Sequence, residues 1–132
     1  MPLFHSLTDI QVKHHAITVS LGGLIDSGAD ESFMDWSLAH KLGVKTELLP
    51  QPLEASALDG SFIFKVTHVT DLVEVSIEDH HELMSFHLFH SAQYPLILGF
   101  PWLKRHNPHI DWCTGKIMKW GGTQGRDRAR TE

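Results

Sequence analysis

Apolar residues in this sequence occur in short runs, and almost every run is bounded by Gly, Pro, Asp or Ser. Short apolar runs with such boundaries are typical of β-strands joined by tight turns rather than of long helices. Only two segments, residues 36–42 and 101–106, have the length and end signals of helices. We therefore expect an all-β fold with one or two short helices.

Turn residues divide the strand-like runs into hairpins. Asp59-Gly60 lies between two such runs, which is a strong hairpin signal. The runs paired in this way are expected to be Leu53–Ala57 with Phe62–Val66, Val69–Ile77 with Leu83–Phe89 across a turn at Glu78–His81, and Ile110–Trp112 with Lys116–Trp120. Gly22-Gly23 is expected to form a turn after a strand at Ala16–Ser20.

Length and composition limit the classes of protein to consider. A chain of 132 residues with 42% hydrophobic content can bury one core, and it is too short for a two-lobed enzyme. Its 20% charged content is too low for a disordered polyelectrolyte. Residues 1–103 hold 4 Lys and Arg against 13 Asp and Glu, whereas residues 104–132 hold 7 against 3. This acidic body argues against a nucleic-acid-binding surface.

The N-terminus and the cysteine content indicate a compartment. Residues 1–10 have neither a basic start nor a long apolar run, and no stretch is long enough to cross a bilayer, so we expect no membrane association. The single cysteine, Cys113, cannot form an intramolecular disulfide. A reducing compartment such as the cytoplasm is therefore expected.

The sharpest chemical feature is Asp26-Ser27-Gly28-Ala29, which directly follows the apolar pair Leu24-Ile25. A glycine at this place lets backbone N–H groups approach the carboxylate of Asp26. Such a loop can hold and polarise an acid. On its own, however, the tetrapeptide also fits an ordinary turn.

Histidine gives a rival signal, because the chain holds 11 of them. A metal site needs convergent ligands, and no His-Glu-x-x-His spacing occurs. The pairs His14-His15 and His80-His81 are expected in or beside turns, where adjacent side chains diverge. We therefore expect neither a metal nor any other cofactor.

A second motif, Pro95-Leu96-Ile97-Leu98-Gly99, follows the Asp-Ser-Gly-Ala loop after about seventy residues and leads into Trp102-Leu103. Taken together, the two motifs resemble those of the retropepsins, the retroviral-type aspartic proteases. The resemblance is closest to the protease segment of Gypsy-type LTR retrotransposons and of genes domesticated from them. It covers residues 16–120, which leaves 1–15 as an N-terminal extension and 121–132 as a disordered basic tail.

The resemblance implies a closed all-β barrel that forms half of a dimeric enzyme. Asp26 matches the catalytic aspartate, and Ser27 and Gly28 match the residues that support its loop. The hairpin of Leu53–Val66 takes the place of the flap, the hairpin that covers bound peptide. The residues expected to contact substrate are Ala29, Asp30, Leu58, Asp59, Gly60 and Ile97.

The number of chains in the expected enzyme follows from its chemistry. Aspartic proteases cleave peptides with two neighbouring carboxylates that share one proton. One chain supplies only Asp26, so the expected enzyme is a homodimer that cleaves a retroelement polyprotein in the cytoplasm or within virus-like particles. The alternative is a domesticated domain with little or no activity that serves as a dimerisation or interaction module. A glycine-poor flap and an apparently short first hairpin favour that alternative.

Overall fold

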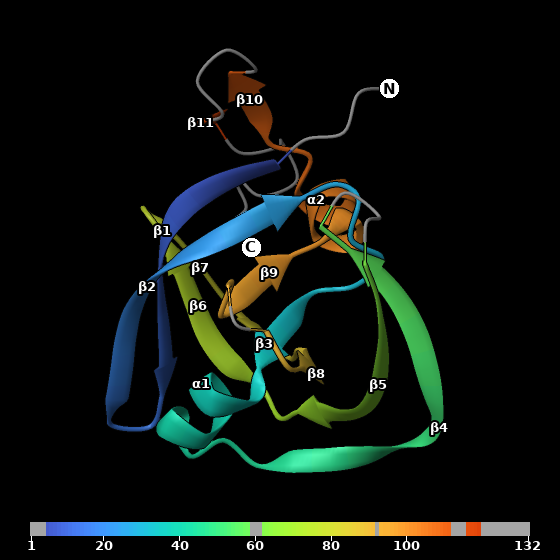
Figure 1. The fold of residues 1–132 in the computed structure, drawn as a ribbon. Helices are drawn as coiled ribbons and strands as arrows, with labels where there is room; N and C mark the ends of the chain where they lie inside the picture. The colour runs from blue at the N-terminus through green and yellow to red at the C-terminus, as the bar shows by residue number, and fades with distance from the viewer. Residues whose placement is uncertain (1–4, 59–61, 92, 112–115, 120–132) are drawn as a thin grey trace.

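The computed structural model describes residues 5–58, 62–91, 93–111 and 116–119 (Figure 1). These residues form eleven strands and two helices. The elements are β1 (His5–His14), β2 (Ile17–Asp26), β3 (Phe33–Asp35), α1 (Trp36–Leu42), β4 (Thr46–Ala57), β5 (Phe62–Thr70), β6 (Val73–Ile77), β7 (His80–Met84), β8 (His87–Phe89), β9 (Leu96–Leu98), α2 (Phe100–His106), β10 (His109–Asp111) and β11 (Lys116–Lys119).

Nine of these strands form one sheet in the order β4-β5-β8-β3-β9-β2-β1-β6-β7, and β10 pairs with β11 separately. Figure 1 shows the sheet curled around a common interior, with β1 and β2 on one side and β4 and β5 on the other. The expected all-β fold with two short helices is confirmed. Within the described residues, the pairing runs as a series that begins at β4 and ends at β7.

The first hairpin differs from its prediction. β1 and β2 pair along ten residues each, from His5 opposite Asp26 to His14 opposite Ile17. The predicted turn at Gly22-Gly23 is wrong, because both glycines lie inside β2, and the chain turns at His15 instead, where φ is 55°. A Cβ on Gly23 would lie 2.3 Å from Cδ1 of Ile10, so the glycine serves close packing between strands.

The first hairpin is therefore long rather than short, which removes one argument for an inactive domain. The chain segment assigned to an N-terminal extension also contains β1, which is an interior strand of the sheet between β2 and β6.

The segment 69–89 also folds differently from the single hairpin expected. β5 ends at Thr70 and a new strand, β6, begins at Val73, while β7 ends at Met84 and β8 begins at His87. The two breaks are held together, because the Thr70 N–H donates to the carbonyl of Phe86 at 2.9 Å and the Phe86 N–H donates to Oγ1 of Thr70 at 3.0 Å. The chain thus passes between two regions of the sheet at this point.

α1 begins and ends where the sequence predicts, and α2 begins at Phe100, one residue before its predicted start. Asp35 caps α1 by accepting a hydrogen bond from the Ser37 N–H at 2.9 Å, and Gly43 closes it with a φ of 66°. Pro101 lies in the first turn of α2, and Asn107 ends this helix with a φ of 42°. Neither described helix has the length and apolar character needed to cross a membrane.

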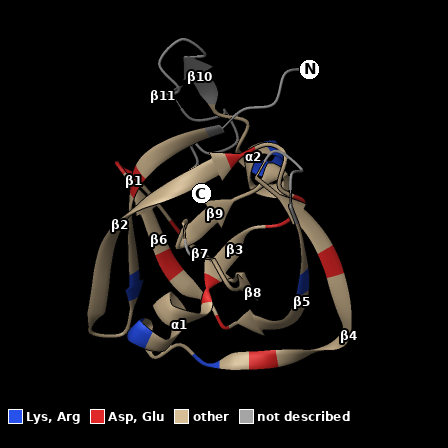
Figure 2. Cartoon of the chain, viewed as in Figure 1, with Lys and Arg blue, Asp and Glu red and all other residues tan. Residues whose placement is uncertain are grey.

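Charge is unevenly distributed over the described part of the chain. In Figure 2 acidic positions recur along β4, and one lies on β6, whereas basic positions are scattered except in α2, whose last turn holds Lys104 and Arg105. The strands therefore present no run of basic residues in this view.

The carboxylate of Asp35 links α1 to a distant loop. Its Oδ2 accepts from the N–H and the hydroxyl of Ser37, and its Oδ1 accepts from the Ser91 N–H at 2.7 Å. Burial by itself raises the pKa of Asp35, but hydrogen bonds from Ser37 and Ser91 and the nearby His90 outweigh it, so the pKa lies below its ordinary value of 3.8. Ionised Asp35 therefore stabilises the fold.

Replacing Asp35 with Ala is expected to lower the free energy of unfolding by about 2 kcal/mol at neutral pH, because a cap and a loop contact are lost together. A carboxyl whose pKa is lower when folded loses its stabilising contribution as pH falls through the folded-state pKa. The difference from the wild type should therefore shrink below pH 3.8. Urea unfolding across acidic pH measures this, with exposed Asp71→Ala as the control. A difference independent of pH would contradict the account.

Candidate active site

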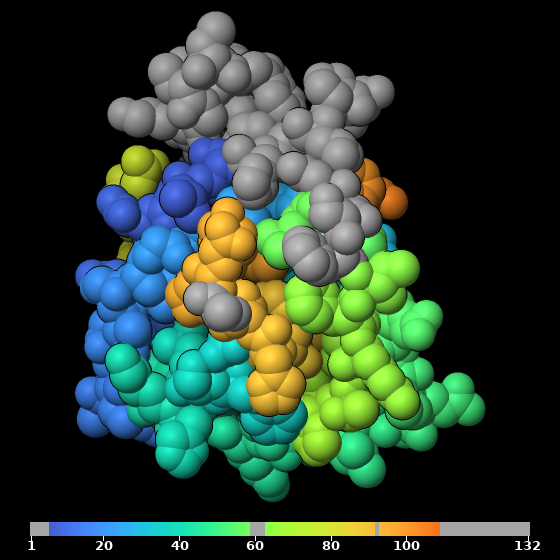
Figure 3. Space-filling model, viewed as in Figure 1, coloured from blue at the N-terminus to red at the C-terminus, as the bar shows by residue number. Residues whose placement is uncertain are grey.

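The two sequence motifs lie side by side in the structure. β9 pairs in parallel with β2, which sets Leu24 opposite Ile97 and Ile25 opposite Leu98. On its other edge β9 pairs antiparallel with β3. Figure 3 shows the orange segment that includes β9 between the blue N-terminal strands and the green hairpin of β4 and β5. β9 thus braces the end of β2, where Asp26 is the last strand residue.

The carboxylate of Asp26 is fully buried, at 0% exposure. Its Oδ1 accepts a hydrogen bond from the Gly28 N–H at 2.9 Å, and its Oδ2 accepts one from the Leu58 N–H at 2.5 Å. The loop turns back at once, since the Ala29 N–H donates to the Asp26 carbonyl at 3.2 Å. The backbone N–H of Gly28 therefore approaches the Asp26 carboxylate, as the motif predicts. Ser27, between these two residues in the sequence, is half-buried.

The hairpin of β4 and β5 covers this loop. Its strands pair from Leu53 opposite Val66 to Ala57 opposite Phe62. Leu58 follows β4 with a φ of 56°, and this conformation turns its N–H onto Asp26. The predicted contact residues Asp59 and Gly60 lie outside the described residues. Sequence reasoning predicted the hairpin but not its contact with the carboxylate.

Asp30 is bonded to Ser56 of β4 through both its backbone N–H and its side-chain carboxylate. The Asp30 N–H donates to the Ser56 carbonyl at 2.8 Å, and the Ser56 N–H donates to Oδ2 of Asp30 at 2.8 Å. The Ser56 hydroxyl donates to the Gly28 carbonyl at 3.3 Å. Asp30, an expected substrate contact, is therefore bonded to the covering hairpin in this chain.

The other two predicted contact residues are buried. Ala29 is 1% exposed and Ile97 is 0% exposed. Both belong to an apolar cluster that joins the loop, β9 and the covering hairpin, and whose buried members are Leu24, Ala29, Phe33, Ala55, Ala57, Val66, Phe89 and Ile97. The structure therefore places these two side chains in the core behind the loop.

Removing the Asp30 carboxylate should loosen the covering hairpin. In Asp30→Ala the Ser56 N–H loses a charged acceptor that contributes about 1.5 kcal/mol. Amide hydrogen exchange at Ser56 and Leu58 should then accelerate by about tenfold, because local opening becomes cheaper by that amount. The control is Glu54→Ala, which removes an exposed carboxylate from β4, the strand that contains Ser56. Equal exchange rates in both variants would show that the bond from the Ser56 N–H to Asp30 does not hold the hairpin closed.

Gly99 fixes the second motif against the first. Its N–H donates to Oγ of Ser32 at 3.1 Å, and the Phe100 N–H donates to the Ala29 carbonyl at 2.9 Å. A Cβ on Gly99 would lie 2.1 Å from the Glu31 carbonyl oxygen and 2.9 Å from that of Ala29. Only a glycine fits this packing. Sequence reasoning missed Ser32, since nothing in its local pattern indicates a partner 67 residues away.

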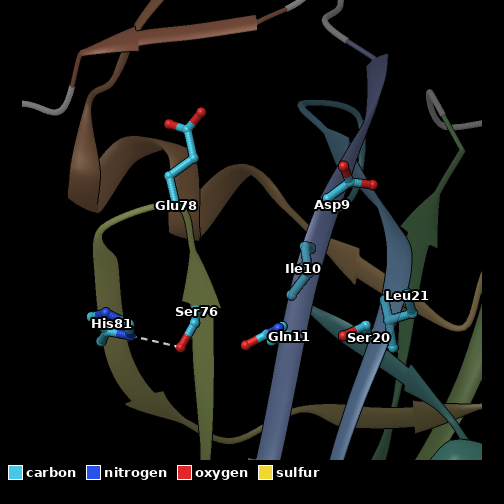
Figure 4. Close-up of a pocket in the computed structure, with 8 residues that line it drawn as sticks. All are labelled: Asp9, Ile10, Gln11, Ser20, Leu21, Ser76, Glu78 and His81. Atoms are coloured by element: carbon cyan, nitrogen blue, oxygen red, sulfur yellow. Dashed lines mark hydrogen bonds between the residues drawn. The ribbon is translucent and has the colours of Figure 1, made fainter.

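The cavities described lie away from Asp26 and Leu58. One cavity, of about 580 Å³, lies over β1, β2 and β6, and Figure 4 shows the residues that line it. It is lined mainly by polar side chains, with a hydrogen bond of 2.7 Å between Ser76 and His81 at one end. This cavity does not include the Asp26 loop.

One group of side chains could hold a metal. His80, Glu82 and His106 bring three possible ligand atoms within 4.8 Å of one another. The predicted turn at Glu78–His81 is too long, because β7 begins at His80 and only Glu78 and Asp79 form the turn. His80 and His81 lie beside the turn, as expected, on opposite faces of β7. The cluster was not predicted, because its third member, His106, comes from α2.

Comparison with known proteins agrees with this geometry. Residues 22–126 match the family described as the PEG10/RTL1 protease domain. The chain is also similar to the solved structure of the retroviral protease-like domain of Ddi1 from Leishmania major, with 20% sequence identity and a TM-score of 0.53. That match covers 80% of this chain and 83% of the other. The predicted resemblance to retrotransposon-type retropepsins and the predicted fold are both confirmed.

Proposed function

Because the chain belongs to the PEG10/RTL1 protease domain family, we propose that it is an aspartic endopeptidase whose active unit is a homodimer. The observation that carries the proposal is the position of the Asp26 carboxylate. It lies at the end of β2, which pairs with β9, and it accepts a hydrogen bond from the Gly28 N–H. Each chain supplies one such loop. Two copies related by a two-fold axis would bring two Asp26 carboxylates together.

Two adjacent carboxylates share one proton, because like charges at close range are not both ionised. In the proposed reaction the ionised Asp26 takes a proton from a water molecule while the protonated Asp26 donates its proton to the peptide carbonyl oxygen. The water oxygen bonds to the carbonyl carbon and forms a tetrahedral gem-diol. As it collapses, the ionised Asp26 takes a proton from one hydroxyl, the protonated Asp26 gives its proton to the nitrogen, and the C–N bond breaks, so that the amine leaves and the pair again holds one proton.

The covering hairpin must move for a peptide to reach Asp26. Opening breaks the bond from the Leu58 N–H and the paired bonds between Asp30 and Ser56. The N–H and the carboxylate of Asp30 then become available to an extended peptide, which would bond to them as Ser56 does in the closed chain. We propose a retroelement polyprotein in a reducing, cytoplasmic setting as the substrate class, with Leu58, Asp59 and Gly60 of the hairpin beside the peptide.

A second candidate function is an inactive interaction module. One observation favours it, namely that Asp26 is fully buried and its carboxylate is bonded to the protein's own hairpin. In this case the chain would associate without cleaving peptide.

Sedimentation together with a pepstatin-sensitive cleavage assay at mildly acidic pH separates the two functions. For the enzyme, specific activity should rise with protein concentration and level off where sedimentation shows dimers, since the site needs two chains. Pepstatin should abolish the cleavage. A dimer without cleavage would favour the interaction module, and a stable monomer that cleaves peptide would contradict the proposed site.

A further inference from the structure

Three side chains converge where β7 meets α2, on elements that carry no part of the Asp26 loop. His80 and Glu82 are two residues apart on β7 and so share one face of the strand, and His106 is the last residue of α2. Nε2 of His80 and Nε2 of His106 each lie 2.9 Å from Oε2 of Glu82. The three side chains are only 8–13% exposed.

The donor set suits a divalent cation. Two imidazole nitrogens and one carboxylate oxygen are ligands that zinc accepts, and such a triad leaves a fourth position for water. A residue that orients a ligand from outside the site is also present. Nη2 of Arg105 donates a hydrogen bond to Oε1 of Glu82 at 2.6 Å. This contact fixes the carboxylate so that its other oxygen, Oε2, faces both imidazoles.

Glu82 is held as an anion. Burial by itself raises the pKa of Glu82, but hydrogen bonds from His106, His80 and Trp102 outweigh burial and hold it well below the usual range.

Oε2 of Glu82 has more close neighbours than lone pairs. Three nitrogens lie 2.9 Å from it, namely Nε2 of His80, Nε2 of His106 and Nε1 of Trp102. A carboxylate oxygen offers two lone-pair sites. A cation bound by the two imidazoles would occupy one of these sites and leave the other to the Trp102 N–H.

From this geometry we propose that His80, Glu82 and His106 bind one divalent cation of the zinc class. The cation ties α2 to β7, with Arg105 and Trp102 holding the carboxylate from outside. Its effect is structural, because α2 follows directly from Gly99 and the bound cation anchors the far end of that helix. The site is independent of the proposed protease reaction.

Zinc titration of the full chain by calorimetry tests the proposal, and the visible absorption of added Co²⁺ reports the ligand geometry. The wild type should bind one Zn²⁺ per chain and gain thermal stability from it. His80→Ala and His106→Ala should each weaken binding by more than about 100-fold, because even partners beyond the ligands are worth roughly 10- to 100-fold. Thermal stability in these variants should no longer respond to zinc.

The matched control is His81→Ala. His81 neighbours His80 on β7 but is exposed and bonded to the Ser76 hydroxyl, so its removal should leave zinc affinity unchanged. If a variant of His80 or His106 fails to fold, the zinc titration of the wild type still tests the proposal. Absence of saturable binding by the wild type would overturn the proposal and identify the cluster as a hydrogen-bonded network alone. Binding that survives His106→Ala but is lost in His81→Ala would also overturn it.

Discussion

Replacing Asp26 with Asn is expected to lower kcat for peptide cleavage by about 10³- to 10⁴-fold, because the shared proton and the general base are lost together. Asn has nearly the same shape, so the Gly28 contact to Oδ1 can persist and the chain should still fold. The measurement is cleavage of a peptide substrate at mildly acidic pH, with circular dichroism to verify the fold.

Asp79→Asn is the control for Asp26→Asn, since it makes the same chemical change in an exposed turn. Its kcat should equal that of the wild type. Unchanged cleavage by Asp26→Asn would remove Asp26 from the mechanism.

Replacing Gly99 with Ala is expected to lower the free energy of unfolding by about 3 kcal/mol or more. The added Cβ would lie 2.1 Å from the carbonyl oxygen of Glu31 and 2.8 Å from its carbonyl carbon. Both are backbone atoms, so no flexible side chain can yield, and the strand or the loop must shift. Because the same shift displaces the loop that follows Asp26, cleavage should fall as well.

Gly22→Ala is a matched control for Gly99→Ala. A Cβ on Gly22 meets nothing within 4 Å, so the change in unfolding free energy should stay within about 0.5 kcal/mol. Urea unfolding of both variants decides the matter. Equal stability of the two variants would show that the packing of Gly99 does not hold the motifs together.

Local signals in the sequence were enough for the site loop and the helices. Asp26 follows a continuous apolar run that is buried on both sides between β1 and β9, and Gly28 provides the backbone approach to its carboxylate. The caps of α1 and the proline of α2 act within a few residues, so the sequence reveals them directly. Predictions based on such short-range chemistry were confirmed.

Features that depend on distant contacts were not predictable. Gly23 is typical of a turn when seen alone, and only the packing of Ile10 explains its place inside β2. Likewise, the strand break at Thr70 depends on Phe86, sixteen residues away. The bond from Leu58 to Asp26 joins residues 32 positions apart, and no local pattern encodes it.

The closed hairpin gives the proposed enzyme a resting form. In the single chain, Leu58 and Ser56 occupy hydrogen-bonding groups of Asp26 and Asp30 that a peptide would use. The proposed activity would therefore require both association of two chains and opening of this hairpin. Each step has its own measurement, namely sedimentation for association and amide exchange for opening.

The most direct test of the central claim is the distance between the two Asp26 carboxylates in a crystal structure of the associated protein. Our account predicts a two-fold symmetric dimer in which the nearest carboxylate oxygens lie within hydrogen-bonding distance, about 3 Å. A dimer that keeps the two carboxylates beyond that reach, with each still covered by its own Leu58, would contradict it.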